Sequence, residues 1–175
     1  MAFRGNMGAA LVALALWSVS SSMALAGKDA ASATSGLPVP RYVSLKSDHV
    51  NVRAGPTKDQ DVSWIYTRSG LPVEVTAEFE NWRRVRDSEG AEGWVYHSLL
   101  SGRRTAVITM KKKDELAALH DNPDGASAVA ARLQAGVVAQ VKRCAAGWCR
   151  ISGNGFDGWI EQERLWGVYA DEKVD

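Results

Sequence analysis

Both cysteines of the chain, Cys144 and Cys149, lie in one stretch with the sequence CAAGWC. Four residues separate them, so the spacing differs from the Cys-x-x-Cys of a redox catalyst. The three histidines, His49, His97 and His120, show no zinc-ligand spacing to the cysteines. We therefore predict neither a redox centre nor a metal site. A structural disulfide is the favoured interpretation, and a buried reduced pair is the alternative.

Motifs that would indicate an enzyme are missing from the sequence. It contains no HExxH, no GxSxG and no glycine-rich loop leading into a helix. Acid pairs such as Glu78 with Glu80 fall in turns or on the polar side of a predicted strand, where solvated carboxylates are normal. We predict that the protein is not an enzyme and uses no cofactor.

An apolar N-terminal run indicates export. Arg4 precedes the uncharged residues 7–19, and Ala24, Leu25 and Ala26 form a signal-peptidase site. The run is shorter than the ~20 residues that span a bilayer. We predict a signal peptide at 1–26, cleaved after Ala26, and a periplasmic or secreted protein without stable membrane insertion. Outside the cytoplasm a close pair of cysteines tends to be oxidised.

The charge balance excludes one class of partner. Removing residues 1–26 takes Arg4 and no acid, so 20 basic residues balance 20 acidic ones. Nucleic-acid binders carry an excess of basic charge, and we predict no nucleic-acid partner. Residues 27–40 are small and polar with two prolines, and they are predicted to form a flexible linker.

The elements that position the remaining residues come from an internal repeat. Residues 73–102 and 139–167 share one pattern, in which Trp82 matches Trp148 at an offset of 66. After one residue is lost in a turn, Gly93 and Trp94 match Gly158 and Trp159. Alternating apolar residues separated by DSEG and SGNG turns predict short strands. We predict two small β units at 41–104 and 105–170, followed by a tail at 171–175.

The motif order resembles a known family. NVRAGP, GLPVEV, NWRRVR and GWVYHSLLSG in the first copy, and GVVAQVKRC, GWCRI and GWIEQERL in the second, are similar to the bacterial SH3-like domain. The resemblance implies an all-β fold of two tandem small SH3-like β-barrels, each with five or six strands.

The repeat also bears on the cysteines. In the first copy, Glu78 and Arg83 occupy the positions of Cys144 and Cys149. An acid and a base at these positions are typical of two residues that face each other across a hairpin. Such a pairing needs a bulge in the hairpin, which we place at Gly147.

Aromatic and basic side chains are the candidate ligand-binding residues. Trp82 and Trp148 have the opposite strand parity to Val85 and Ile151, so each points away from an inward-facing apolar residue. In the SH3-like family a tryptophan at the comparable place lines the ligand groove, although core packing stays the alternative here. Trp94 and Trp159 are expected in the core. The candidate ligand-binding set is Tyr66, Trp82, Arg84, Tyr96, Trp148 and Arg150.

The resemblance also implies a partner. Bacterial members of the family are commonly cell-wall-targeting modules, so the expected ligand is peptidoglycan or its peptide stems. A periplasmic protein–protein adaptor that docks an envelope enzyme or transporter is the alternative.

Overall fold

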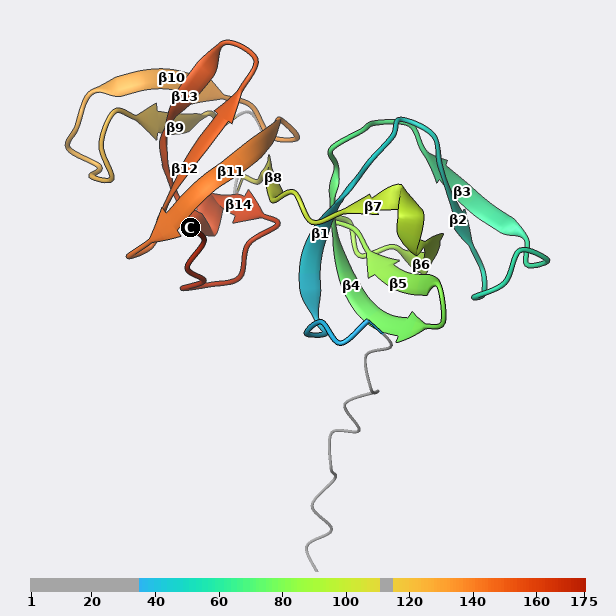
Figure 1. Ribbon diagram of the computed structural model, residues 1–175. Coiled ribbons are helices and arrows are strands. Elements are labelled where there is room, and N and C mark those ends of the chain that lie inside the picture. The colour runs from blue at the N-terminus through green and yellow to red at the C-terminus, as the bar shows by residue number, and fades with distance from the viewer. Residues whose placement is uncertain (1–34, 111–114) are drawn as a thin grey trace, which may run out of the picture.

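The computed structural model describes residues 35–110 and 115–175, which form two β units in tandem (Figure 1). The predicted signal peptide, 1–26, and residues 27–34 of the predicted linker lie outside the described residues. The strands of the first unit are β1 (Arg41–Leu45), β2 (Val50–Arg53), β3 (Val62–Tyr66), β4 (Pro72–Phe79), β5 (Trp82–Arg86), β6 (Glu92–Tyr96) and β7 (Leu100–Ser101). Those of the second are β8 (Thr105–Ile108), β9 (Ala117–His120), β10 (Val129–Leu133), β11 (Val138–Ala145), β12 (Trp148–Gly153), β13 (Phe156–Glu161) and β14 (Leu165–Trp166).

The two units share one topology. Their sheets have the strand orders β3-β2-β6-β5-β4-β1-β7 and β10-β9-β13-β12-β11-β8-β14, so adding seven to each label converts the first into the second. A short 3-10 turn, His97–Leu99 or Gln162–Arg164, precedes the last strand of each unit. The prediction of an all-β fold made of two tandem units is confirmed. Each sheet has seven strands instead of five or six, because β2 and β3 are separate and a two-residue strand closes the unit.

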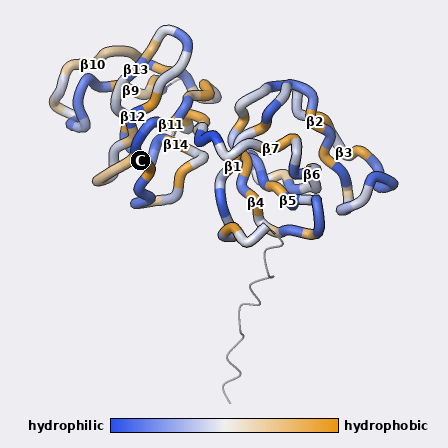
Figure 2. Tube along the Cα trace, viewed as in Figure 1, coloured by the Kyte–Doolittle hydropathy of each residue, from blue (hydrophilic) through white to orange (hydrophobic). Residues whose placement is uncertain are grey.

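Each unit has its own apolar core, built from alternate residues of the strands. The first core is mainly valine, with Val50, Val52, Val73, Val75, Val85 and Val95 fully buried. The second contains larger side chains, including Ile108, Leu119, Ile151 and Ile160, and it also contains the two cysteines. In Figure 2 the hydrophobic segments accordingly follow the strands, and hydrophilic segments dominate the connecting loops.

A bulge sets the register of the central hairpin in both units. The register shifts between Val75 and Ala77 in the first and between Val141 and Arg143 in the second. The bulge therefore lies at Lys142, and its placement at Gly147 was wrong. Gly147 instead sits in the two-residue turn that joins β11 to β12, at φ 79° beside Ala146 at φ 51°. Such a tight turn requires positive φ, which glycine adopts without strain.

The repeated Gly-Trp pair marks a close approach between strands. A Cβ on Gly93 would lie 2.4 Å from Val52 Cγ1, and a Cβ on Gly158 would lie 2.8 Å from the carbonyl oxygen of His120. At this point β6 pairs with β2, and β13 pairs with β9, each through a single residue pair. Glycine is needed at both positions because no side chain fits between the crossing strands.

Aromatic rings join the two units. The ring of Tyr42 lies 5.1 Å from that of Trp166 and 4.6 Å from that of Tyr169, between centroids. The Tyr169 hydroxyl donates to Glu74 Oε1 at 2.9 Å, and Arg86 forms an ion pair with the other oxygen of Glu74. Burial, together with the Glu74 charge, raises the pKa of Tyr42 to about 12. These contacts bury Glu74, although it lies on the strand face opposite the core.

The described part of the predicted linker, residues 35–40, contacts the first unit. The backbone amide of Ser35 donates to Glu78 Oε2 at 2.8 Å, and its hydroxyl donates to Oε1 at 2.7 Å. Val39 packs against the valine core. Within the described ranges, no helix has the length and apolarity to cross a bilayer.

Candidate functional site

The outer face of β5 and β6 brings together three of the predicted residues. Trp82 pairs across the strands with Tyr96, and Arg84 pairs with Trp94. All four have the opposite parity to the core residues Val85 and Val95, as predicted for Trp82. This surface, Trp82, Arg84, Trp94 and Tyr96, is called the first aromatic face below.

Trp82 is the buried member of this face and packs beneath the Tyr96 ring. Its side chain is only 8% exposed, yet it lies outside the valine core. The Tyr96 ring packs edge-on against it, with centroids 5.3 Å apart and planes at 81°. Tyr96 and Trp94 are half-buried and present the accessible part of the face. The expectation that Trp94 lies in the core was therefore wrong, because its strand parity places it opposite Val95.

Arg84 borders the face with a charge that is already paired. Its Nη2 lies 2.6 Å from Glu92 Oε2, and both side chains are partly exposed. An exposed ion pair of this kind adds little to stability, so a ligand carboxylate can replace Glu92 at small cost.

The second unit carries a related but different face on β12 and β13. Trp148 is half-buried and packs at 90° against the His120 ring, 5.6 Å away. Glu161 takes the place that Tyr96 has in the first unit. Arg150 faces Trp159 across the strands and forms a 2.8 Å ion pair with Asp157. Like Trp94, Trp159 lies outside the core and is half-buried, which corrects the same expectation.

Tyr66 does not join the first aromatic face. Its hydroxyl donates to Asp87 Oδ2 at 3.0 Å, just beyond the end of β5. Trp82 begins the same strand, so a strand length of about 15 Å separates Tyr66 from Trp82. Burial and the neighbouring Asp87 raise the pKa of Tyr66, which keeps its hydroxyl protonated as a donor.

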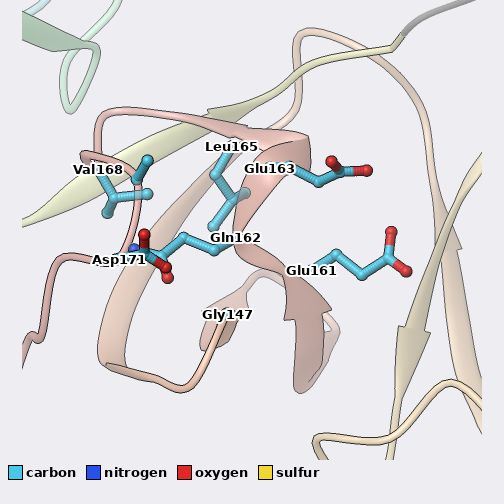
Figure 3. A pocket seen from close by; sticks show the side chains of 8 residues that line it. Gly147, Glu161, Gln162, Glu163, Leu165, Val168 and Asp171 are labelled. Atoms are coloured by element: carbon cyan, nitrogen blue, oxygen red, sulfur yellow. The ribbon is translucent and has the colours of Figure 1, made fainter.

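A hollow of about 420 Å³ opens beside the second unit's 3-10 turn (Figure 3). Gly147, Leu165 and Val168 supply its apolar lining, and Glu161 and Asp171 supply acidic groups. Gln162 extends toward the segment that contains Val168 and Asp171 (Figure 3). Among the described residues, no group of three or more His, Cys, Asp or Glu side chains could hold a metal ion.

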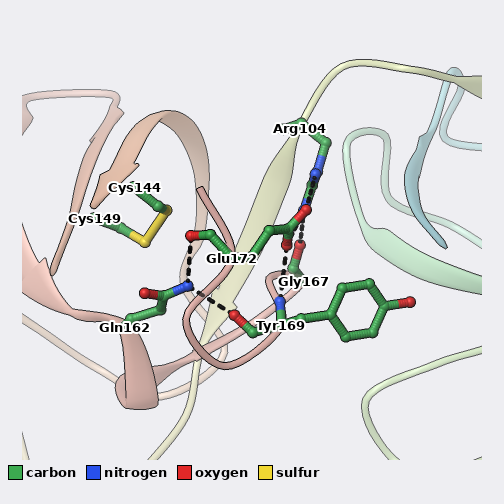
Figure 4. Close-up of a disulfide and its surroundings, with 7 residues drawn as sticks. All are labelled: Arg104, Cys144, Cys149, Gln162, Gly167, Tyr169 and Glu172. Atoms are coloured by element: carbon green, nitrogen blue, oxygen red, sulfur yellow. Dashed lines mark hydrogen bonds and ion pairs between the residues drawn. A yellow bond between two sulfur atoms is a disulfide. The ribbon is translucent and has the colours of Figure 1, made fainter. Parts of the chain in front are cut away.

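Cys144 and Cys149 form a disulfide, as favoured from the sequence (Figure 4). They face each other in the β11–β12 register, and both are buried. The Cys144 amide donates to the carbonyl of Val174 at 2.8 Å, and the Val174 amide donates back at 3.2 Å. The predicted tail is thus paired with the strand that carries the disulfide.

Further bonds hold the same C-terminal segment. Arg104 forms a 2.7 Å ion pair with Glu172, and Gln162 Nε2 donates to the carbonyls of Tyr169 and Glu172 (Figure 4). Burial opposes ionisation of Glu172, but hydrogen bonds from Arg104 and from the Tyr169 amide lower its pKa below the ordinary value. Glu172 is therefore a structural carboxylate.

In the first unit, Glu78 and Arg83 face each other where the second has the disulfide. Glu78 Oε1 lies 3.0 Å from Arg83 Nε and 2.6 Å from Arg41 Nη2, and the Glu78 side chain is only 1% exposed. Burial raises the cost of its charge, yet hydrogen bonds from Ser35 and Arg41 lower its pKa overall. The sequence-based picture of a solvated carboxylate was wrong here.

Sequence reasoning assigned no role to Trp64, Asp87 and His120. The one signal for Trp64 was its spacing of two from Tyr66 in VSWIY, which places both on one face of β3. His120 ends the motif ALH in the second copy and takes the place of Arg53 in the first, because each pairs with the tryptophan after the repeated glycine.

A family model described as the bacterial SH3 domain matches the chain twice, at residues 46–102 and 113–167. No curated protein matches it. Two solved structures are similar, NlpC2 and NlpC1 from Trichomonas vaginalis, each at 16% identity and with TM-scores of 0.34 and 0.33. These matches cover 79% and 76% of this chain and 51% and 48% of the other chains. The chain spans about half the length of those two proteins.

Proposed function

The chain belongs to the bacterial SH3 domain family, and from this premise we propose that it is a non-enzymatic cell-envelope protein that binds peptidoglycan through its peptide stems. Modules of this family commonly bind cell-wall peptidoglycan. The proposal makes the two aromatic faces the contact surfaces.

The observation that carries the proposal is the repetition of an aromatic face at the same strands of both units. In the first, Trp94 and Tyr96 are half-buried beside Arg84, and in the second, Trp148 and Trp159 are half-buried beside Arg150. Half-buried tryptophan and tyrosine combine an apolar body with a polar edge, which suits contact with a ligand. The arginines, in exposed ion pairs, can exchange their partner for a carboxylate of a peptide stem.

The ionisable groups support binding rather than catalysis. The carboxylates and guanidinium groups with displaced pKa values, such as Glu78, Glu172 and Arg164, are engaged in ion pairs that connect segments of the fold. A catalytic acid or base would instead face a cavity that receives the substrate.

Export is part of the proposal. The N-terminal pattern at 1–26 is that of a signal peptide, and the Cys144–Cys149 disulfide suits an oxidising compartment. We place the protein in the periplasm or outside the cell. Two units in one chain would raise the retention of weak individual sites by avidity.

Co-sedimentation with purified sacculi tests the proposal, using the chain from residue 27. We expect saturable retention that falls about tenfold in W94A/W159A, because each substitution removes ring area from one face while leaving the valine and isoleucine cores intact. The matched control is L37A, which removes an exposed apolar side chain outside both faces. Circular dichroism checks that the variants stay folded.

Retention no greater than that of an inert protein of equal net charge would refute peptidoglycan binding. In that case, cross-linking in the periplasm asks whether one envelope protein is recovered in stoichiometric yield, which would identify an adaptor instead.

A further inference from the structure

The first unit contains a groove that lies apart from its aromatic face. Its volume is about 420 Å³, and it runs between β3, the start of β4 and the loop after β5. Trp64, Tyr66 and Leu71 supply apolar lining, and Asp87, Glu89 and Ala91 supply the loop side. In Figure 1 the β2–β3 hairpin, which carries Trp64 and Tyr66, extends to one side of the unit.

Two rings form the aromatic wall of this groove. Trp64 and Tyr66 share one face of β3, with ring centroids 6.0 Å apart and planes at 87°. Both side chains are half-buried and pack partly against the valine core, so the core fixes the orientation of the wall.

The loop side of the groove carries negative charge that is fixed in place. Asp87 Oδ1 accepts hydrogen bonds from the amides of Glu89 at 3.0 Å and Ala91 at 2.9 Å, while Oδ2 accepts from the Tyr66 hydroxyl. Glu89 is exposed at the rim. Throughout residues 35–110 and 115–175, no basic side chain forms an ion pair with Asp87 or Glu89. The groove therefore combines aromatic rings with two carboxylates that are not paired with any basic side chain of the described residues.

The second unit shows that the fold does not require this groove. Strand pairing places Gly153 and Phe156 at the positions of Asp87 and Ala91. The Phe156 ring lies over Gly153, where a Cβ would be 2.3 Å from its Cζ. Phe156 also packs against the second core. An aromatic ring and a glycine thus replace the acidic loop side, and strand pairing puts Ala131 and Leu133 in place of the aromatic wall.

We propose that the Trp64–Tyr66–Asp87 groove binds a primary alkylammonium group, supplied by the free side-chain amine of a diamino acid in a cell-wall peptide. The ammonium lies near the Asp87 and Glu89 carboxylates and the ring faces, and its methylene chain lies along Trp64. The identity of the source rests on the proposed function, whereas recognition of the amine rests on the groove alone.

The first experiment tests amine recognition by NMR titration of the chain from residue 27, followed at the Trp64 indole N–H. The probe is Nα-acetyl-lysine methylamide, and Nα-acetyl-norleucine methylamide is the uncharged control of similar length. We expect saturable shifts in the millimolar range with the lysine probe and at least tenfold weaker binding of the norleucine probe. Equal shifts with both probes, or none with either, would overturn the proposal.

Two variants locate the binding. A91F introduces the ring that the second unit has at this place, and D87N/E89Q removes both charges; each should weaken binding of the lysine probe about tenfold. D59N removes an exposed carboxylate elsewhere in the first unit and should leave binding unchanged. Unaltered affinity in both A91F and D87N/E89Q would show that the probe binds elsewhere, and either variant suffices if the other does not fold.

A second experiment identifies the source of the amine. Sacculi are acetylated to block their free amines and are then compared with untreated sacculi in co-sedimentation. Lower retention on acetylated sacculi, with no further loss in A91F, supports the cell-wall peptide. Equal retention on both overturns that source while leaving peptidoglycan binding intact. Failure to bind untreated sacculi refutes the proposed function, and binding of the lysine probe then assigns the groove to a lysine side chain of a protein.

Discussion

The two units solve one structural problem with different chemistry. At the facing positions of the central hairpin, the first unit places the Glu78–Arg83 ion pair and the second places the Cys144–Cys149 disulfide. The register and the bulge that bring these residues together are the same in both units. The comparison teaches that both units stabilise this point with a bonded pair, and that the kind of bond differs between them.

The two pairs also lie beside the segments that flank the units, one before the first unit and one after the second. Glu78 accepts hydrogen bonds from Ser35, so the first pair holds the segment that enters its unit. Cys144 pairs through its backbone with Val174, so the strand of the second pair holds the segment that leaves. The ion pair depends on its surroundings, because a buried carboxylate needs several donors, whereas the disulfide needs none.

The largest expected effect comes from E78A. The substitution leaves Arg41 and Arg83 without their shared carboxylate in a largely buried position, which costs about 3–5 kcal/mol of unfolding free energy. Hydrogen exchange should quicken in β4 and β5 and change little in β11 and β12. E80Q, at the exposed turn beside it, is the control. Equal loss of protection in both units would contradict the expectation that the Glu78 ion pairs stabilise the first unit alone.

Removal of the disulfide should have a smaller effect. Closing so short a loop contributes about 2 kcal/mol in the chain-entropy model, and C144A/C149A should lose that amount. Urea unfolding followed by hydrogen exchange in β11 and β12 measures it. A reducing agent should destabilise the wild type to a similar extent and leave C144A/C149A unaffected. Insensitivity of the wild type to reduction would mean that packing alone holds the hairpin.

The smallest expected effect is a difference between the ion pair and the disulfide in how their contribution to the unfolding free energy depends on pH. The pKa of Glu78 is lowered in the folded state, so its stabilising contribution is present above the unfolded-state pKa and is lost as pH falls through the folded-state pKa. The difference in unfolding free energy between the wild type and E78Q should therefore shrink on acidification below about pH 4.5. The difference between the wild type and C144A/C149A should stay constant over that range. Parallel curves for both comparisons would show that Glu78 is not the responsible group.

Much of the fold could be predicted because the pattern within each repeat depends on residues that are close in the sequence. The offset between Trp82 and Trp148, and the alternation around Val75 and Val141, depend on neighbours along a strand, which the sequence displays directly. The same alternation placed Trp82 opposite Val85. It could not predict that Trp82 is buried, because that depends on the Tyr96 ring from the next strand.

The errors at Glu78 and Trp94 have one physical cause. Glu78 is buried by partners that are distant in sequence, Ser35 and Arg41, and a polar strand position gives no sign of them. Trp94 was assigned to the core from its size, yet the crossing at Gly93 fixes its parity and turns it outward. The groove at Asp87 was missed because it forms only where β3 meets the loop after β5.

The stacking of Tyr42 on Trp166 and Tyr169 has a consequence for how the molecule moves. Tyr169 is also hydrogen-bonded to Glu74, so the two units should not reorient freely about the short connection at 102–104. Both units should tumble in solution with one rotational correlation time. Any two binding surfaces on different units would then be held at one fixed separation.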